Sequence, residues 1–497
     1  MLTRADPRLP YGFARREGVV LLVPGDVMTV GYRRGANPLA LVEARRLLER
    51  PLSVEVLEDA AFERRLSDIY ASDALAGDGD DDLAIPSGLE GLVEDLPPAE
   101  DLLDSHDDAP VIRLINGVIA EAVRVGASDI HLETFETRLV VRLRVDGVLR
   151  EALSLNPRMA PLLVSRIKVM ARLDIAEKRV PQDGRIALML GGRNLDVRVS
   201  TLPSRGGERV VLRVLDRDRL GVDLDSLGMG PDERAAFEQA LTDPHGIILV
   251  TGPTGSGKTT SLYAALSRLN DGQRNILTVE DPVEYAVEGV GQTQVNTRVG
   301  MTFAAGLRAI LRQDPDVVMV GEIRDAETAA IAVQASLTGH LVLSTVHTND
   351  AAGAVTRLRD MGVEPFLLAS SLRMILAQRL VRKLCLECRQ EDHLDAATAA
   401  RIGLVPGTPC WRPVGCPSCS GTGYEGRQGV HEVIRVTEPI RRLIAASASD
   451  EALAKAAFGE AGKGMLADRV RGLVARGVTS VEEAVRVTGD QAAGEAL

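Results

Sequence analysis

The apolar positions of the chain follow two different periods, and the change between them predicts where helices and strands lie. Apolar residues recur at helical spacing over residues 111–122, which predicts an amphipathic helix. Over residues 138–145 they alternate with arginines, and an Asp-Gly pair follows as a hairpin turn. A second alternating stretch spans residues 186–199 and is interrupted by two glycines. These patterns predict a compact α+β domain over residues 110–222.

A different pattern begins near residue 223. Unbroken apolar runs, such as Ile247–Val250, alternate with stretches of helical spacing, such as residues 260–269. Strands that are apolar on both faces are typical of a parallel sheet that is covered by helices on both sides. Residues 223–497 therefore predict an α/β domain, which the smaller α+β domain precedes.

The first part of the chain predicts a small domain followed by a tether. Residues 1–71 contain a short apolar strand at 19–23 and a helix from Leu39 to Glu49. Residues 72–109 are acidic and rich in glycine and proline, a composition that is typical of a flexible linker. Apolar side chains most often lie in a core, but some here fit an interface equally well. These are Phe13, Val20 and Leu22.

Composition narrows the class of protein. The 497 residues carry a net charge of −12, and 45% are apolar and 26% charged, as in soluble globular proteins. The acidic balance argues against general binding of nucleic acid. No apolar run approaches the ~20 residues that span a bilayer, and the start of the chain lacks a signal-peptide pattern. We therefore expect a cytoplasmic protein that meets a membrane only through a partner.

The segment GPTGSGKT, residues 252–259, matches the phosphate-loop pattern G-x-x-x-x-G-K-[ST] in full. Its glycines let backbone N–H groups converge on phosphate oxygens, and the N-terminus of the next helix adds a favourable partial charge. We expect Lys258 to reach the phosphates and Thr259 to offer its hydroxyl to Mg²⁺. No lysine follows an asparagine, as a guanine-binding N-K-x-D pattern requires, so ATP is preferred over GTP. The expected ligands of ATP and Mg²⁺ here are Gly252, Pro253, Thr254, Gly255, Ser256, Gly257, Lys258, Thr259 and Thr260.

Acidic residues follow two further apolar strands. Glu322 comes after the run 317–320, and we expect it to hold Mg²⁺ through water or to polarise the attacking water. Glu280 lies at the end of another apolar run and is the candidate general base, provided that it reaches the γ-phosphate. The carboxyl ends of parallel strands meet at one edge of a sheet, which places both acids near the loop. With Lys258 they make up the expected catalytic set.

Two histidines, His340 and His347, flank a further apolar strand. A histidine at the end of a strand is usually structural, but this strand is expected to lie in the same sheet as the phosphate loop. A structural role and a nucleotide-sensing role therefore both stay open, and His347 is included among the candidate nucleotide ligands.

All five cysteines lie between residues 385 and 419. Cys385 and Cys388 form one C-x-x-C pair, and Cys416 and Cys419 form a second. Four thiolates complete a tetrahedral shell, which predicts a structural Zn²⁺ site in an insert at residues 384–420 whose middle forms a lobe of its own. A redox pair or unligated thiols are the alternatives, and Cys410 is expected not to bind the metal.

Four sequence boxes occur in a fixed order: GPTGSGKT, ILTVEDPVE at 276–284, VVMVGEIRD at 317–325 and HLVLSTVHTND at 340–350. The glutamate in VGEIRD, where most P-loop enzymes have aspartate, is specific to one superfamily. With these boxes the chain resembles the secretion-superfamily ATPases over nearly its whole length. It is most similar to the type II secretion assembly ATPases, general secretory pathway protein E, and LPYGFARREGVVLL favours this branch over the pilus branch.

The resemblance implies a RecA-like ATPase fold, a hexameric ring and a PAS-like smaller domain whose arginines reach the bound nucleotide. The matching positions are Arg198 and Arg213. It also implies the tetracysteine insert, and an N-terminal domain that docks onto the cytoplasmic domain of an inner-membrane platform protein. ATP hydrolysis in this family powers assembly of a pseudopilus and export of proteins, without nucleic acid as a partner.

Three other functions stay open from the sequence. A type IV pilus extension ATPase shares all four boxes and the insert. A DNA-translocating relative requires a basic, aromatic stripe, which this acidic chain lacks. A scaffold that binds nucleotide and barely hydrolyses it is the third.

Overall fold

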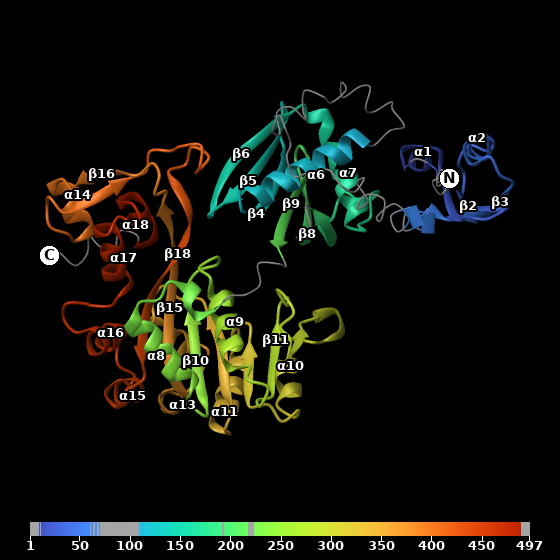
Figure 1. The fold of residues 1–497 in the computed structure, drawn as a ribbon. Helices are drawn as coiled ribbons and strands as arrows, with labels where there is room; N and C mark the ends of the chain where they lie inside the picture. Colours follow the sequence, from blue (N-terminus) through green and yellow to red (C-terminus); the bar gives the residue numbers. More distant parts are fainter. Residues whose placement is uncertain are drawn as a thin grey trace. The chain divides into compact units, whose positions relative to one another are not determined.

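The structure, a computed structural model, describes residues 9, 11–59, 61–62, 65–66, 69, 109–190, 193–216 and 223–488. The predicted linker at 72–109 therefore lies almost wholly outside the described residues, as does the glycine turn at 191–192. The chain forms two compact units, Met1–Leu220 and Gly221–Leu497, and each is described by itself (Figure 1). Within the described residues, no helix combines the length and the apolar character that crossing a bilayer requires.

The N-terminal part of the first unit is a three-stranded sheet with two helices. β1 (Val19–Val23) pairs antiparallel with β2 (Met28–Arg33), and β2 pairs parallel with β3 (Leu52–Leu57). The parallel pair is connected by helix α2 (Leu39–Leu48), and α1 (Tyr11–Glu17) precedes the sheet. The predicted helix ends one residue early, because Glu49 adopts the left-handed conformation as its C-cap. Phe13 and Val20 are buried, so both belong to the core.

The second part of this unit is a six-stranded antiparallel sheet in the order β6-β5-β4-β9-β8-β7. Its core consists of one face of the sheet and the apolar faces of two helices, and the predicted helix at 111–122 is one of them. The Asp-Gly turn joins β5 to β6, as predicted. The elements are α6 (Ala109–Arg124), β4 (Ala127–Thr134), β5 (Leu139–Val145), β6 (Val148–Leu155), α7 (Ala160–Met170), β7 (Gln182–Leu190), β8 (Arg193–Ser204) and β9 (Gly207–Asp216).

The second unit is built on a seven-stranded sheet in the order β12-β11-β13-β14-β10-β15-β18. All neighbours are parallel except the edge strand β18, which runs antiparallel to β15. The structure thus confirms the predicted fold class, and the antiparallel edge adds a strand that the sequence did not predict as such. The strands are β10 (Gly246–Thr251), β11 (Ile276–Glu280), β12 (Val290–Gln294), β13 (Val317–Val320), β14 (Leu341–Val346), β15 (Leu372–Leu384) and β18 (Tyr424–Arg435).

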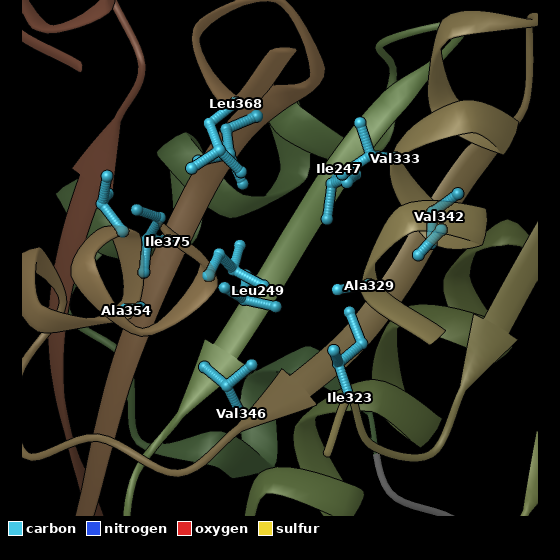
Figure 2. Close-up of a cluster of buried hydrophobic side chains, with 14 of the residues drawn as sticks. Ile247, Leu249, Ile323, Ala329, Val333, Val342, Val346, Ala354, Leu368 and Ile375 are labelled. Carbon is cyan, nitrogen blue, oxygen red and sulfur yellow. The ribbon is translucent and has the colours of Figure 1, made fainter. Parts of the chain in front are cut away.

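Apolar side chains of β10 point alternately to the two faces of this sheet. Ile247 and Leu249 belong to one core cluster, which Figure 2 shows, whereas Ile248 and Val250 belong to the other. Both faces are therefore covered, which explains the unbroken apolar run. The helices of this unit are α8 (Pro231–Leu241), α9 (Lys258–Leu269), α10 (Phe303–Ile310), α11 (Ala326–Leu337), α12 (Ala352–Asp360), α13 (Pro365–Ser371), α15 (Glu438–Ala445), α16 (Asp450–Phe458), α17 (Leu466–Ala475) and α18 (Val481–Thr488).

A small lobe interrupts the hairpin of β15 and β18. It contains β16 (Gln390–His393), α14 (Ala396–Ile402) and β17 (Pro409–Arg412), and the two strands pair antiparallel. The residues between the two C-x-x-C pairs therefore form a small sheet and a helix, and their apolar side chains share a core with α17 and α18. Three short 3₁₀ helices complete the described elements: Pro157–Met159, Leu224–Leu227 and Thr297–Val299.

Candidate nucleotide site and metal site

The phosphate loop joins the end of β10 to the start of α9, at the carboxyl edge of the sheet. Gly252, Gly255 and Gly257 have φ angles of 147°, 79° and 90°, which side chains other than glycine rarely adopt. A Cβ at Gly257 would lie 2.8 Å from Nε2 of Gln378, whereas one at Gly255 would meet nothing within 4 Å. The loop is therefore packed tightly against β15 on one side and open on the other.

The side chains of the loop differ in their exposure to solvent. Pro253, Thr254, Thr259 and Thr260 are exposed, so the two hydroxyls at the start of α9 are accessible. Ser256 is buried, and its Oγ has no hydrogen-bond partner among the described residues. In folded proteins, a buried hydroxyl group almost always has a hydrogen-bond partner. Together with the open side at Gly255, it fits a loop that accepts an additional polar group such as a phosphate.

Lys258, the first residue of α9, turns its ammonium back into the loop. Its Nζ donates to the carbonyl oxygens of Gly252, at 2.8 Å, and Pro253, at 3.0 Å. Burial of the ammonium lowers its pKa from 10.5 to about 8, while Glu322 acts in the opposite direction. Neutral carbonyls are weak partners for a buried cation. Lys258 is therefore a charge that an anion would stabilise.

Glu322 and His347 lie near Lys258 at the edge of the sheet where the phosphate loop begins. Nδ1 of His347 is 3.5 Å from Nζ of Lys258, and Nε2 of His347 is 3.3 Å from Oε2 of Glu322. Glu322 also forms an ion pair with Arg324. These residues follow the neighbouring strands β13, β14 and β10, whose carboxyl ends meet at this edge. The structure thus brings together an ammonium, a carboxylate and an imidazole around the phosphate loop.

Glu280, the candidate general base, is 3% exposed and engaged by three donors. One carboxylate oxygen accepts from Thr278 Oγ1 at 2.6 Å and from Gln292 Nε2 at 3.1 Å, and the other accepts from the Tyr263 hydroxyl. Burial, and then the Glu280 carboxylate, raise the pKa of Tyr263. Hydrogen bonds of catalytic groups often rearrange when substrate binds. The assignment stays a prediction, and it requires that these donors release Glu280 to water.

The two histidines that flank β14 have different surroundings. His340 lies before the strand, and its Nδ1 is 2.9 Å from the carbonyl oxygen of Ala335 at the end of α11. This is a structural contact at a helix terminus. His347 lies after the strand, beside the phosphate loop. Only His347 is therefore placed to contact a nucleotide.

Sequence reasoning missed polar residues that support the loop from β15. Oε1 of Gln378 accepts from Ser261 Oγ of α9 at 2.6 Å, and Gln378 packs against Gly257. Arg379 donates to the Asn349 carbonyl oxygen at 2.8 Å, and burial lowers the pKa of its guanidinium. A Gln-Arg pair inside the apolar run LRMILAQRLV was the available signal, because polar residues interrupt a buried strand only at a cost.

Arg198 and Arg213 lie in the other unit, on adjacent strands. The two residues are directly opposite each other in the register of β8 and β9. Nε of Arg213 donates to Oδ1 of Asp129 at 3.0 Å. The structure brings these arginines together with each other, and their approach to the nucleotide stays a prediction.

The four predicted metal ligands Cys385, Cys388, Cys416 and Cys419 form one cluster, in which all four Sγ atoms lie within 4.8 Å of one another. The closest Sγ separations are 3.7 and 3.8 Å. A tetrahedron of sulfurs about 2.3 Å from a central metal has edges of about 3.8 Å, so the spacing fits one ion. Cys410 is buried in the lobe and is not part of the cluster, as predicted.

Backbone groups stabilise the thiolate of one member of this cluster. Sγ of Cys419 accepts from the N–H groups of Cys416, at 3.2 Å, and Gly423, at 3.1 Å. Burial alone would raise the pKa of the Cys419 thiol, but these donors outweigh burial and hold the pKa below its usual range. Stabilised thiolates are the form that binds a metal.

The chain matches two family models. The model described as Type II/IV secretion system protein covers residues 104–486, and a model of a GSPII protein E domain covers residues 8–70. Type II secretion system protein E of Pectobacterium carotovorum subsp. carotovorum is 55% identical over 491 residues, which is 98% of either chain. Type II secretion system ATPase E of Vibrio cholerae serotype O1 is 52% identical over 494 residues, 97% of this chain and 96% of the relative.

Solved structures agree on the fold. The Legionella pneumophila ATPase DotB superposes with a TM-score of 0.57 at 21% identity, over 76% of this chain and 95% of that one. The pilus retraction motor PilT, solved with bound ADP, gives a TM-score of 0.52 at 26% identity, over 76% and 97% of the two chains. Taken with the family models and the full-length relatives, these findings show that the chain belongs to the type II/IV secretion system protein family and, within it, to the ATPases named type II secretion system protein E.

Proposed function

We propose that the chain hydrolyses ATP and uses the energy to drive protein export by a type II secretion system. One observation carries the chemical part of this proposal. Lys258, Glu322 and His347 converge where three neighbouring strands end, beside a loop whose backbone is open on one side. An anion with several charges is what such a set of groups would bind.

The roles of the residues follow from their surroundings. Backbone N–H groups of the loop would cradle the phosphates, and the Lys258 ammonium would exchange its two carbonyl partners for phosphate oxygens. The exposed hydroxyl of Thr259 and the Glu322 carboxylate would hold Mg²⁺. When bound, Mg²⁺ neutralises charge on the phosphates. Glu280 would serve as general base once Tyr263 and its other donors release it.

Arg198 and Arg213 supply the proposed mechanical link. The two arginines lie opposite each other on adjacent strands, so the pair would offer guanidinium donors to one anion. We infer that they contact the terminal phosphoryl group and that ATP thereby connects the two units of the chain. Loss of that group would break the contact, so hydrolysis would be coupled to motion between the units. A ring of six such chains would act as the working assembly.

The N-terminal sheet is the proposed docking module. It carries exposed apolar residues on α2, where Leu39 and Val42 are 70% and 67% exposed. Because Phe13 and Val20 lie in the core, this helix is the better candidate for contact with a partner. The partner would be the cytoplasmic domain of an inner-membrane platform protein, which would keep the ATPase cytoplasmic and peripheral to the membrane. The cysteine cluster would hold a structural Zn²⁺.

The type IV pilus extension ATPase is the weaker alternative. Its motor domain would share the fold, as the likeness to PilT indicates. The match of residues 8–70 to a GSPII protein E domain and the full-length relatives favour the secretion system instead.

The test uses the chain assembled with the cytoplasmic domain of its platform protein. Glu322→Gln is expected to lower the rate of ATP hydrolysis by roughly 10²-fold or more, because it removes a charge beside the reacting phosphates, while nucleotide still binds. Glu327→Gln is the matched control, since Glu327 is an exposed acid that pairs only with Arg308 among the described residues. Hydrolysis that survives Glu322→Gln would refute the assignment. Export restored by the wild type and not by Glu322→Gln, in cells that lack the ATPase, tests the coupling.

A further inference from the structure

Five charged side chains form one row across the six-stranded sheet, whose strands Figure 1 shows. In register, Asp129 of β4 lies opposite Arg144 of β5 on one side and Arg213 of β9 on the other. Arg198 of β8 lies opposite Arg213, and Arg185 of β7 lies opposite Arg198. The five register positions of the row therefore hold four arginines and one carboxylate. Arg185 also forms an ion pair with the buried Asp196, whereas Asp129 is the carboxylate that pairs with Arg213 and lies beside Arg144.

The side chain of Asp129 is fixed by contacts other than its bond to Arg213. Its side chain is 10% exposed, and Oδ2 accepts from Ser128 Oγ at 2.8 Å and lies 3.7 Å from Nε of Arg144. The other oxygen, Oδ1, accepts from Nε of Arg213 at 3.0 Å. The side chain of Arg213 is 59% exposed. A fixed, buried carboxylate thus accepts a hydrogen bond from Nε of an exposed arginine, the guanidinium nitrogen nearest to its aliphatic chain.

The point of attachment decides what Arg213 can do. A guanidinium has five N–H donors in one plane, and the bond to Asp129 uses the one on Nε. That bond restricts the plane of the group and leaves the terminal Nη donors for another acceptor. We propose that Asp129 is a positioning residue that orients Arg213 toward the terminal phosphoryl group of the nucleotide. This inference rests on the phosphate-binding role proposed above for Arg213.

Asp129 has two opposing effects on a bound anion. Its own charge repels the phosphate, which at a partly exposed site weakens binding by about threefold. Without the charge of Asp129, however, a neutral acceptor would hold Arg213 only weakly. Arg213 would then lose the freedom of a long side chain on binding, which weakens affinity roughly tenfold or more. Orientation therefore outweighs repulsion, and removal of the carboxylate is expected to weaken binding.

Calorimetry on the full chain measures the affinity for a non-hydrolysable ATP analogue and for ADP. Asp129→Asn is expected to weaken the affinity for the analogue roughly three- to tenfold. The affinity for ADP is expected to stay within about twofold, because only the analogue carries the terminal phosphoryl group. In an Arg213→Ala background, Asp129→Asn is expected to have no further effect, since it acts through Arg213. Asp129→Glu is expected to recover part of the affinity. Thermal unfolding of each variant shows whether it is folded.

Glu133→Gln is the matched control. Glu133 lies on the same strand, is equally buried and also pairs with two arginines, Arg142 and Arg209, but it is outside the row. It is expected to leave both affinities unchanged. If Asp129→Asn leaves analogue binding unchanged or tighter while Arg213→Ala weakens it, the inference alone is overturned. If Asp129→Asn weakens ADP equally, or still acts without Arg213, its role is structural and the inference is again overturned. If Arg213→Ala itself has no effect, the phosphate-binding role fails.

Discussion

The two units each bury one lysine, and the two lysines have opposite kinds of partner. Lys168 of α7 is 0% exposed, forms an ion pair with Glu208 and donates to the carbonyl oxygen of Glu177 at 2.7 Å. Lys258 is 9% exposed and donates to two neutral carbonyl oxygens of its own loop. Within the part of the chain that the structure describes, no carboxylate lies within ion-pair distance of Lys258.

This difference separates a structural charge from a functional one. A buried cation with its own carboxylate is already neutralised, so it fixes α7 against β9 and needs no ligand. A buried cation whose contacts are two carbonyl oxygens and a histidine ring gains energy when an anion arrives. Burial lowers the pKa of Lys258 even though Glu322 acts in the opposite direction. Burial of a charged side chain alone therefore does not identify a functional site, whereas burial without an ion-pair partner points to one.

The cysteine cluster is the corresponding case for negative charge: it gathers groups that can bind a cation. Four sulfurs converge in a partly buried lobe, and backbone N–H groups favour the thiolate form of Cys419. The four sulfurs lie close enough to one another to share a single bound cation. The cluster resembles the phosphate loop in that both are arranged for a charge that the chain itself does not supply.

The largest effect is expected at this cluster. Cys416→Ser should abolish stoichiometric binding of Zn²⁺ and unfold the lobe between β15 and β18, because metal binding free energy of about 10 kcal/mol or more is folding free energy in such sites. Cys410→Ser is the control, since Cys410 lies outside the cluster. Metal analysis and limited proteolysis of the lobe provide the measurements. Equal zinc content in both variants would contradict the assignment.

Exchange of the two lysines for alanine tests the contrast directly. Lys168→Ala leaves Glu208 buried without a partner and should lower the free energy of unfolding by about 3–5 kcal/mol. Lys258→Ala should leave stability unchanged or higher, yet reduce ATP hydrolysis by roughly 10²–10³-fold. Lys178→Ala, at an exposed lysine, should change neither quantity. Chemical denaturation and the hydrolysis rate of the assembled ring are measured for each. If Lys258→Ala lowers the free energy of unfolding as much as Lys168→Ala does, the distinction between a structural and a functional lysine is wrong.

Local sequence patterns predicted the elements whose chemistry is local. The phosphate loop, the strand at 317–320 and the Asp-Gly hairpin each follow from a few consecutive residues, and the structure has all three. What the sequence did not reveal depends on packing between distant segments. The donors that surround Glu280 come from α9, β11 and β12, and Gln378 supports the loop from a strand more than a hundred residues away. No spacing rule connects such residues, because tertiary packing alone makes them neighbours.

The smallest expected effect concerns the proton on Lys258. Its pKa of about 8 in the free protein should rise when phosphates surround it, because an anion favours the charged form. When the pH lies between the pKa of Lys258 in the free protein and its pKa in the complex, nucleotide binding must take up a proton. The affinity for nucleotide should therefore fall by about tenfold for each pH unit above 8. Near pH 6.5 the lysine is already charged, and its contribution to proton uptake should vanish.

Calorimetry in two buffers with different ionisation enthalpies measures this proton uptake directly. The triphosphate is almost fully ionised above about pH 7.5, so it contributes little to the change at higher pH. Lys258→Arg provides the control, because a guanidinium does not lose its proton in this range and its binding should be independent of pH between about 8 and 9.5. If the wild type also shows no proton uptake at pH 9, Lys258 is fully charged before the nucleotide binds. In that case its neutral carbonyl partners stabilise the ammonium as well as a carboxylate would, and the distinction between the two buried lysines would disappear.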